Sequence, residues 1–330
     1  MHFDLKRRQF IMMQRAAAVS AVFVAAIGIA TASVQAAEYP ERNVELVIPY
    51  PAGGGIDLLL RALAEGYSAH FKQPFTVANR TGAGGAIGVA YVARAAPDGY
   101  TLLFVPALVH SVLPVMQTNV GYTPRSFEPI CQTFENQMAL IVRPESPFKT
   151  AGDVVLAVRS KPITYAATAP GTITHLAAAA LADAAGAPLN HVPFRGDAEL
   201  MGQLIGGHVD FAVTTLASAA AAGTSIRVVA IFADARNTSL PEAPTVKEQG
   251  YDVAPTSFGG LFAPTGVPAD VMAKLQAGCR ISVQETAYVE MAKRLHQGSR
   301  YYADAAAFAK RLEQDVEDKR LLLQRLGLPK

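Results

Sequence analysis

The sequence is poor in cysteine, in charge and in recognisable catalytic motifs, and each shortage narrows what the protein is. Its 330 residues suffice for one large domain or two ordinary ones. Two cysteines, Cys131 and Cys279, exclude a disulfide scaffold and a cysteine-based zinc cluster. With 51% hydrophobic and only 17% charged residues, intrinsic disorder is excluded as the main state.

The common enzyme motifs are also missing. The glycines of Gly82–Gly88 are spaced as GxGxxxG rather than the GxGxxG of dinucleotide-binding folds. No GxSxG serine elbow and no HExxH metal motif is present, and the seven histidines are dispersed. We therefore expect no cofactor, no metal and no catalytic residues. An exported hydrolase using Asp57 or His175 as base stays as the alternative, and a surface interaction protein with a vestigial cleft is a third interpretation.

The formal net charge of +2 comes from the N-terminus. The first 36 residues hold Lys6, Arg7, Arg8 and Arg15 against Asp4, a net +3, so the rest of the chain carries −1. A slightly acidic body without a basic patch is poor material for binding a polyanion. Nucleic acid is therefore not an expected partner.

Residues 1–36 have the pattern of an export signal. A basic start precedes an uncharged run of 22 residues, 16–37, which contains the small-x-small pattern Val34-Gln35-Ala36. We expect cleavage after Ala36 or Ala37 and a soluble periplasmic protein, while the twin-arginine and general export routes both stay open. In an oxidising compartment the two cysteines would either pair or stay as small buried hydrophobes.

Apolar segments alternate with amphipathic ones along the rest of the chain, which predicts parallel sheets with helices on their faces. There are too many strands for one small sheet, so two α/β lobes fit best, with crossings near 140–143 and 257–261. One lobe would comprise residues 37–142 plus 257–330 and the other residues 143–256. A single doubly wound domain is the alternative.

Three loops that follow predicted strands and open predicted helices are the candidate binding elements: 49–57, 79–85 and 168–175. In open α/β sheets, ligands bind beyond the carboxyl ends of the strands. A helix start offers unpaired N–H groups and a partial positive charge, and glycine allows close approach to them. Such loops form an anion site that needs no lysine or arginine. For Asp57 a structural role in the first helical turn and a role toward a ligand are equally open, and Arg195 by itself is typical of a surface charge.

At these residues the sequence resembles the Bug or tripartite tricarboxylate transporter receptors, a family of extracytoplasmic solute-binding proteins. The resemblance runs from Tyr39-Pro40 nearly to the C-terminus, and the motifs that carry it are Val47-Ile48-Pro49-Tyr50-Pro51-Ala52-Gly53-Gly54-Gly55-Ile56-Asp57, Asn79-Arg80-Thr81-Gly82-Ala83-Gly84-Gly85, Ala96-Pro97-Asp98-Gly99-Tyr100-Thr101-Leu102-Leu103, His191-Val192-Pro193-Phe194-Arg195-Gly196 and Leu240-Pro241-Glu242-Ala243-Pro244-Thr245.

The resemblance implies a type II periplasmic-binding-protein fold, with two α/β lobes, a hinge and a ligand closed between them. It implies a small carboxylate as ligand, without naming the carboxylate. As partners it implies a membrane transporter of the tripartite tricarboxylate type and, as a subsidiary hypothesis, sensor proteins. With the candidate loops, it gives these expected ligand-binding residues: Tyr50, Ala52, Gly53, Gly54, Asp57, Asn79, Ala83, Gly84, Gly85, Thr168, Thr172, Thr174, His175, Phe194 and Arg195.

The chain departs from the family pattern at two places. Family members often have tryptophan where this chain has Phe258, a difference expected to reshape the pocket wall. They often have Asp-Phe where this chain has Ser126-Phe127-Glu128, a difference expected to be peripheral.

Overall fold

A computed structural model gives the fold. It describes residues 38–116, 120–160, 163–186, 189–194, 196–253, 255, 257–297, 301–325 and 327. The chain divides into two compact units, residues 1–41 and 42–330. Of the first unit only residues 38–41 are described, and they form neither helix nor strand. The predicted export signal therefore lies outside the described residues.

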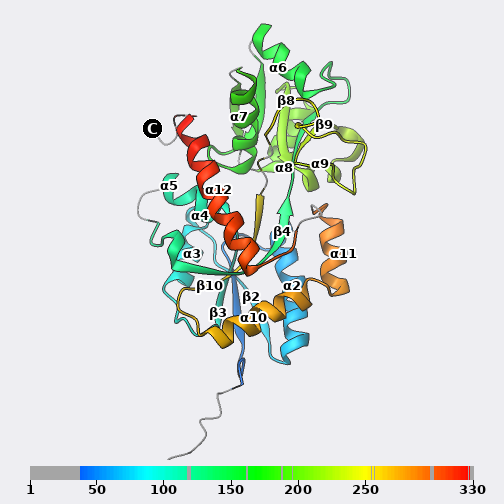
Figure 1. Ribbon diagram of the computed structural model, residues 1–330. Coiled ribbons are helices and arrows are strands. Elements are labelled where there is room, and N and C mark those ends of the chain that lie inside the picture. The colour runs from blue at the N-terminus through cyan, green and yellow to red at the C-terminus, as the bar shows by residue number, and fades with distance from the viewer. Residues whose placement is uncertain are drawn as a thin grey trace, which may run out of the picture. The chain divides into compact units, whose positions relative to one another are not determined.

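The second unit contains two sheets with helices around them (Figure 1). The part built on the six-stranded sheet is called lobe 1 below, and the part built on the five-stranded sheet is called lobe 2. In lobe 1 the strands lie in the order β11-β4-β10-β3-β1-β2. Their bounds are β1 Val44–Ile48, β2 Phe75–Asn79, β3 Thr101–Pro106, β4 Phe127–Asn136, β10 Ser257–Pro264 and β11 Ala303–Asp304.

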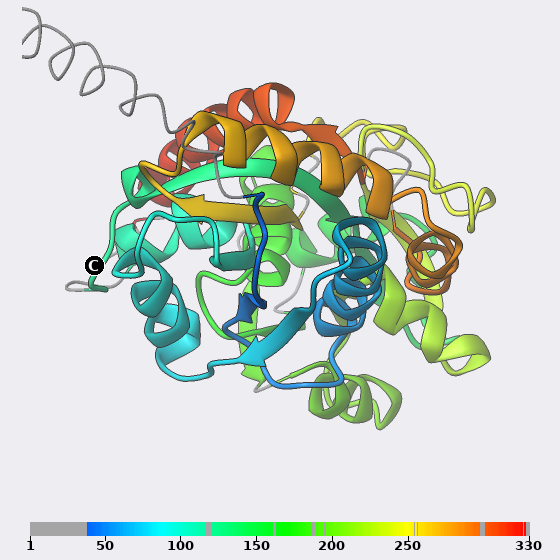
Figure 2. The same ribbon diagram turned by 90° about the horizontal axis from the view of Figure 1, so that it is seen from below.

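Strands β1, β2 and β3 run parallel, as the alternation of strand and helix predicted, and β10 and β4 join them antiparallel. An apolar cluster that includes Val47, Leu103 and Val105 joins one face of the sheet to α3 and α12. Helix α10 lies beside α2 (Figure 2), and Tyr67 on α2 donates a hydrogen bond to the Leu275 carbonyl on α10, 2.7 Å away. The helical segments are α2 Gly55–Phe71, η1 Ala83–Gly85, α3 Ala86–Ala93, α4 Leu108–Ser111, α5 Leu113–Met116, η2 Pro124–Ser126, α10 Ala269–Ser282, α11 Thr286–Arg294 and α12 Ala305–Arg325.

Lobe 2 has the strand order β7-β6-β8-β5-β9, in which β7, β6 and β8 are parallel neighbours. A capping box opens α6: the Asp153 amide donates to the Thr150 hydroxyl, and the Thr150 amide donates to the Asp153 carboxylate. The elements of lobe 2 are β5 Met138–Val142, α6 Ala151–Ser160, β6 Thr164–Thr168, α7 Ile173–Ala185, β7 Asn190–Phe194, α8 Asp197–Ile205, β8 Phe211–Thr215, α9 Leu216–Ala221, η3 Gly223–Ser225 and β9 Arg227–Phe232.

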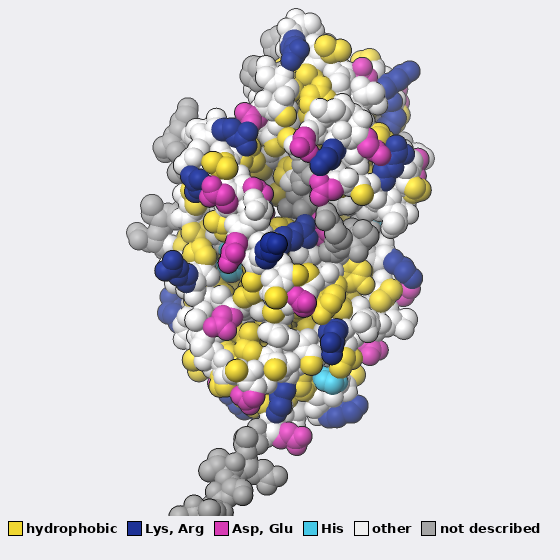
Figure 3. All heavy atoms as spheres, viewed as in Figure 1, with side chains coloured by type: hydrophobic (Ala, Val, Ile, Leu, Met, Phe, Trp, Pro, Cys, Tyr) yellow, Lys and Arg dark blue, Asp and Glu magenta, His cyan; other side chains and the backbone are white. Residues whose placement is uncertain are grey.

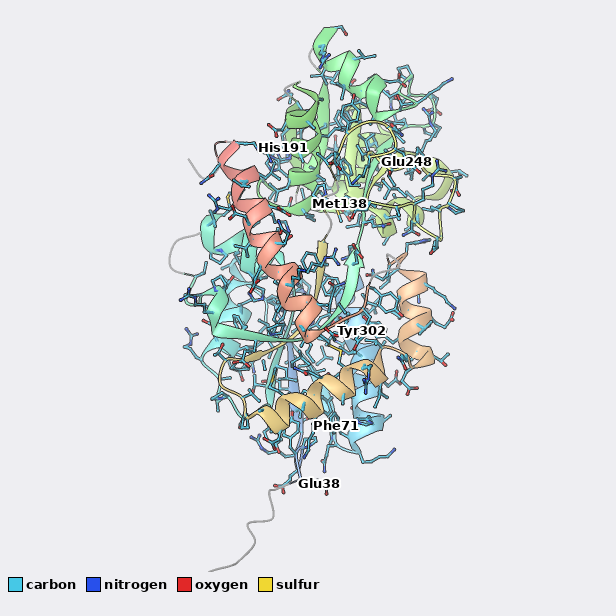
Figure 4. The ribbon with its side chains drawn as sticks, viewed as in Figure 1. Glu38, Phe71, Met138, His191, Glu248 and Tyr302 are labelled. Atoms are coloured by element: carbon cyan, nitrogen blue, oxygen red, sulfur yellow. A yellow bond between two sulfur atoms is a disulfide. The ribbon has the colours of Figure 1, made fainter. Side chains whose placement is uncertain are left out.

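The chain changes sheet at Gln137, between β4 and β5, which corrects the predicted lobe boundary at residue 142. Strand β5 pairs with β8 and β9, and every one of its residues is buried. An all-apolar strand needs neighbours and cover on both faces, but its own residues do not say which sheet supplies them. Figure 4 labels Met138, where the chain enters lobe 2, together with Phe71 and Tyr302 in lobe 1.

Strand β4 is the longest strand that was not predicted from the sequence. It buries polar side chains that break the apolar pattern, and the C-terminal part of the chain supplies partners for them. Gln132 donates to the Tyr301 carbonyl at 3.1 Å, and Arg311 forms a 2.8 Å ion pair with Glu135. Cys131 on β4 forms a disulfide with Cys279 on α10, with 6.6 Å between their Cα atoms, which answers the open question of pairing.

Helix α12 crosses from lobe 1 to lobe 2 (Figure 1). Its residues Leu322 and Leu323 pack in one apolar cluster with Leu176 and Ala180 of α7. Among the described residues, no helix combines the length and the hydropathy that crossing a membrane requires.

Candidate functional site

The two glycine-rich loops of lobe 1 leave neighbouring parallel strands at the same edge of the sheet. Ile48, the last residue of β1, is in register with Asn79, the last residue of β2. A Cβ added to Gly85 would lie 3.5 Å from the Pro49 ring, so the second loop packs directly on the first. The φ angle of Gly85 is 106°, which residues with side chains rarely adopt.

Asp57 and Asn79 tie these loops together. The Asp57 carboxylate accepts hydrogen bonds from the Gly53 amide at 2.9 Å, from the Arg61 guanidinium at 2.9 and 3.1 Å, and from the Asn79 side-chain amide at 2.9 Å. The same Asn79 amide group also donates to the Tyr50 carbonyl at 3.0 Å. These two side chains fix the shape of both loops.

The charge of Asp57 is stabilised where it lies. Its residue is 1% exposed, and this burial by itself raises the pKa of the carboxyl. Hydrogen bonds from Arg61, Gly53 and Asn79 outweigh the burial and hold the pKa below its usual value. A carboxylate with a lowered pKa and four donors is poorly placed to act as a general base. Its contacts are those of a supporting residue, and its role toward a ligand stays a prediction.

The remaining predicted residues of these loops present mainly backbone to solvent. Ala52, Gly53 and Gly54 are exposed in the first loop, and Ala83 and Gly84 are exposed in the second. Tyr50, between the loops, is half-buried, and desolvation of its hydroxyl raises its pKa to about 12, so it stays a neutral donor at physiological pH.

In lobe 2 the predicted threonines contact one another. The hydroxyls of Thr168, Thr172 and Thr174 lie between 2.6 and 3.2 Å apart. This cluster closes the turn between β6 and α7, and Gly171 at its tip comes next to Met116 of lobe 1.

His175 is held neutral. Its Nδ1 accepts the Gly171 amide at 3.2 Å, and its ring lies 4.6 Å from that of His191, which Figure 4 labels. Burial, with a smaller contribution from His191, lowers the pKa of His175 to about 4. Phe194 ends β7 and packs against the apolar cluster under α8, and Arg195 lies outside the described residues.

A cavity of ≈ 370 Å³ lies between the lobes, beside these loops. Gly55 and Ile56, at the start of α2, form part of its lobe 1 wall. The other lining residues are Asn136 and Gln137 at the crossing, Asp197, Thr215, Leu216, Ala217, Ser218 and Ala221 in lobe 2, and Leu295, His296 and Gln297 after α11.

This lining does not include the residues predicted from the sequence. At the start of α2 the cavity is lined by Gly55 and Ile56, which follow the predicted Gly54. In lobe 2 it is lined by the starts of α8 and α9, whereas the predicted residues lie at the start of α7. Thr215 carried a usable signal, because a hydroxyl residue that ends a strand and caps the next helix resembles the predicted 168–175 loop. Asp197 and the residues after α11 carried none, since only the fold brings them to the cavity.

Buried amide side chains join the two lobes at one edge of the cavity. Asn237 of lobe 2 donates to the Gln137 side chain at 2.8 Å and to the His296 carbonyl at 3.3 Å. Gln297 donates to Asn136 at 2.7 Å and accepts from the Glu135 amide at 2.9 Å. The crossing of the chain between the lobes is therefore held by directed hydrogen bonds.

A second cavity, of ≈ 510 Å³, lies under α12, and Phe258 lines this one rather than the first. Phe258 is 3% exposed, with the Arg311 guanidinium 3.9 Å from its ring centre, so the expectation that it shapes the wall of the ligand cleft is not met in the ≈ 370 Å³ cavity. Acidic side chains outnumber basic ones in the second lining: Glu135, Asp234, Asp252, Asp315 and Asp318 against Arg311, Lys319 and Arg325. That composition does not favour an anionic ligand there.

The charges visible in Figure 3 are intermixed. Basic and acidic side chains alternate over this face, and its coloured residues form no broad patch of one sign. This face offers no surface for a polyanion.

Two α/β lobes joined by strand crossovers, with helix starts from both lobes at one cavity, define a two-lobed solute-binding protein. The chain belongs to the tripartite tricarboxylate transporter family of receptors, whose family model matches residues 59–328. The fold and the family predicted from the sequence are both confirmed.

Individual relatives agree with this assignment. The UPF0065 protein in the gbd 5′ region of Cupriavidus necator is 32% identical over 332 residues, which cover 99% of each chain. A TctC solute-binding protein from Polaromonas, solved without ligand, is 30% identical with a TM-score of 0.76, covering 87% of this chain and 99% of that one. The periplasmic binding protein BugD is 30% identical with a TM-score of 0.73, covering 88% of this chain and 99% of that one.

Proposed function

We propose that this protein is a periplasmic receptor that binds a small carboxylate between its lobes and delivers it to a membrane transporter of the tripartite tricarboxylate type. The observation that carries the proposal is the ≈ 370 Å³ cavity that is lined by the start of α2 on one side and by lobe 2 on the other. Its size falls within the range of small-molecule pockets.

The start of α2 suits a carboxylate. The first N–H groups of a helix have no partner inside it, and the helix dipole places partial positive charge there. Gly55 and Ile56 line the cavity, and a carboxylate against their amides would need no lysine or arginine. The exposed backbone of 52–54 and 83–84 lies in the adjoining loops and extends this surface. Arg195 stays in the proposed set from the family resemblance.

A ligand that contacts both lobes stabilises the closed form in proportion to its preference for that form. The transporter would then recognise the closed receptor, and a sensor protein is a further proposed partner. Residues 1–36 are proposed to direct export and to be removed, which the mass of the protein from the periplasmic fraction would test.

The main test is thermal unfolding, followed by circular dichroism, across mono-, di- and tricarboxylates and amino acids. A ligand at 100 times its dissociation constant adds about 2.7 kcal/mol to the free energy of unfolding. Ala217→Phe, which places a ring in the cavity, should abolish the stabilisation, and Ala198→Phe, at an exposed position on α8 outside the lining, should keep it.

Silence across the panel would contradict the proposal. Stoichiometric retention of an unchanged ligand supports a receptor, whereas turnover would favour the hydrolase instead.

A further inference from the structure

The lining of the interlobe cavity contains a single fixed charge among the residues that the structure describes. That charge is the carboxylate of Asp197, in the first turn of α8. His296 is the other titratable residue of the lining, and neither lysine nor arginine is among the described lining residues. A cavity for a simple anion would be expected to hold the opposite charge or none.

Two hydroxyl groups donate hydrogen bonds in series toward the carboxylate of Asp197. The Ser218 amide donates to the Thr215 hydroxyl at 3.1 Å, and that hydroxyl donates its proton to the Ser218 hydroxyl at 2.8 Å. The proton of Ser218 is then directed to Oδ2 of Asp197. Because each hydroxyl has one proton to donate, this series of hydrogen bonds offers Asp197 a donor and no acceptor. A donor is the partner that an ionised carboxylate requires.

The hydroxyl chain occupies one oxygen of Asp197 and leaves the other with acceptor capacity. Within the described part of the chain, Oδ2 has the contact to Ser218, while Oδ1 has no hydrogen bond from a protein group. The side chain is half-buried at the wall of the cavity. A half-buried carboxylate oxygen of this kind is a strong acceptor for a cationic N–H group.

The two walls of the cavity therefore have opposite polarity. The start of α2 offers amide N–H groups and partial positive charge, and Asp197 offers a full negative charge. A ligand with only carboxylates would place a like charge near Asp197. A zwitterion would satisfy both walls at once.

We propose that the ligand is an amino-substituted carboxylate, with its ammonium group bound by Oδ1 of Asp197 and its carboxylate at the start of α2. This rests on the proposed receptor function and names the class of its ligand. Asp197 is then a specificity-determining residue, and Ser218 and Thr215 are positioning residues that act through it.

The experiment uses calorimetric titration of the full receptor with pairs of acids that differ only by an amino group. The pairs are L-glutamate and glutarate, L-leucine and 4-methylpentanoate, and L-phenylalanine and 3-phenylpropionate. In at least one pair the amino acid should bind tighter by roughly tenfold or more, the effect of one charge-assisted hydrogen bond. Asp197→Asn should reduce that ratio to near one.

Two further variants serve as controls for the Asp197→Asn result. Glu199→Gln removes a carboxylate from the same helix but not from the cavity lining, and it should keep the wild-type ratio. Asp197→Glu keeps the charge and should retain the preference if Asp197→Asn loses it. Circular dichroism of each variant without ligand verifies the fold, and should Asp197→Asn fail to fold, Ser218→Ala replaces it and should weaken the same preference.

The outcomes separate the two proposals. If the acids without an amino group bind as tightly as the amino acids, or if Asp197→Asn leaves the ratio unchanged, the zwitterion assignment is overturned and the receptor function stands. If no acid of this or the wider carboxylate panel binds, both fall. Mass spectrometry of ligand released from gently purified protein provides an independent decision, because a ligand without an amine overturns the assignment.

Discussion

The side-chain amide of Asn79 lies 2.9 Å from the carboxylate of Asp57 and donates a hydrogen bond to it. Asp57 lies in the first turn of α2, and Asn79 ends β2, 22 positions later in the sequence. This contact joins the β1–α2 loop and the β2–α3 loop into one surface. The exposed face of this surface is mainly backbone, and Asp57 is buried beneath it. The exposed amides of the surface therefore depend on a buried carboxylate that contributes no atom to it.

Replacing Asp57 by alanine should lower the free energy of unfolding by about 1–3 kcal/mol, because the Gly53 amide and the half-buried Asn79 side chain lose the acceptor that joins the two loops. The Arg61 side chain is 48% exposed, so water replaces much of its part of the ion pair. Urea unfolding followed by circular dichroism measures the change. Glu290→Ala, which removes an exposed ion pair to Lys293, serves as control and should change the value by less than about 1 kcal/mol.

The free energy of unfolding should fall as the pH is lowered, and part of this fall should come from protonation of His110. This residue is 6% exposed between the rings of Phe127 and Phe262, and burial lowers the pKa of its imidazole from 6.5 to about 4. In the unfolded chain the imidazole binds a proton below about pH 6.5, whereas in the folded protein it does so only near pH 4. The contribution of neutral His110 to the free energy of unfolding is therefore complete above pH 6.5 and is lost between pH 6.5 and pH 4.

The variant His110→Leu should therefore lose less stability between pH 7 and pH 4 than the wild type. His175 has a pKa lowered in the same direction, so some dependence should remain. Unfolding in urea at a series of pH values measures both profiles, and the exposed His70→Leu should follow the wild type. Parallel profiles for His110→Leu and the wild type would contradict the assignment.

The disulfide should be a large contributor to stability. It joins β4 to α10 across 148 residues, and a crosslink of this kind contributes about 2–4 kcal/mol, chiefly by restricting the unfolded chain. The double variant Cys131→Ala, Cys279→Ala should unfold at lower urea than the oxidised wild type. Dithiothreitol should destabilise the wild type and leave the double variant unchanged. Equal midpoints for oxidised and reduced wild type would show that the bond contributes nothing.

Two helical glycines should respond to alanine in opposite ways. In α2, a Cβ on Gly66 would lie 2.7 Å from the Cβ of Ser282, so Gly66→Ala should destabilise by about 1–3 kcal/mol through overpacking. In α8, a Cβ on Gly202 would meet nothing within 4 Å, so Gly202→Ala should stabilise by about 0.5–1 kcal/mol. Each variant is the control of the other in one denaturation series. Changes of the same sign would contradict the packing described for α2 and α10.

Much of the fold was predictable because its elements have clear local patterns. The alternation of apolar and amphipathic segments predicted parallel strands with helices between them, and each sheet contains three parallel strands. Apolar runs between turns predict buried strands, and apolar residues at helical spacing predict helices. Strand β4 was missed because its buried polar residues find their partners more than 150 positions later, at Gln297, Tyr301 and Arg311.

By itself the sequence determined the α/β class, the family and the loops that open helices after strands, because these depend on residues close together in the chain. Only the tertiary structure decided which loops share a cavity and which charges meet there. Gln137, Asp197 and His296 lie far apart in the sequence and come together where the lobes join. Local patterns record the form of each segment, whereas the meeting of distant side chains depends on strand order and crossovers, which no local pattern encodes.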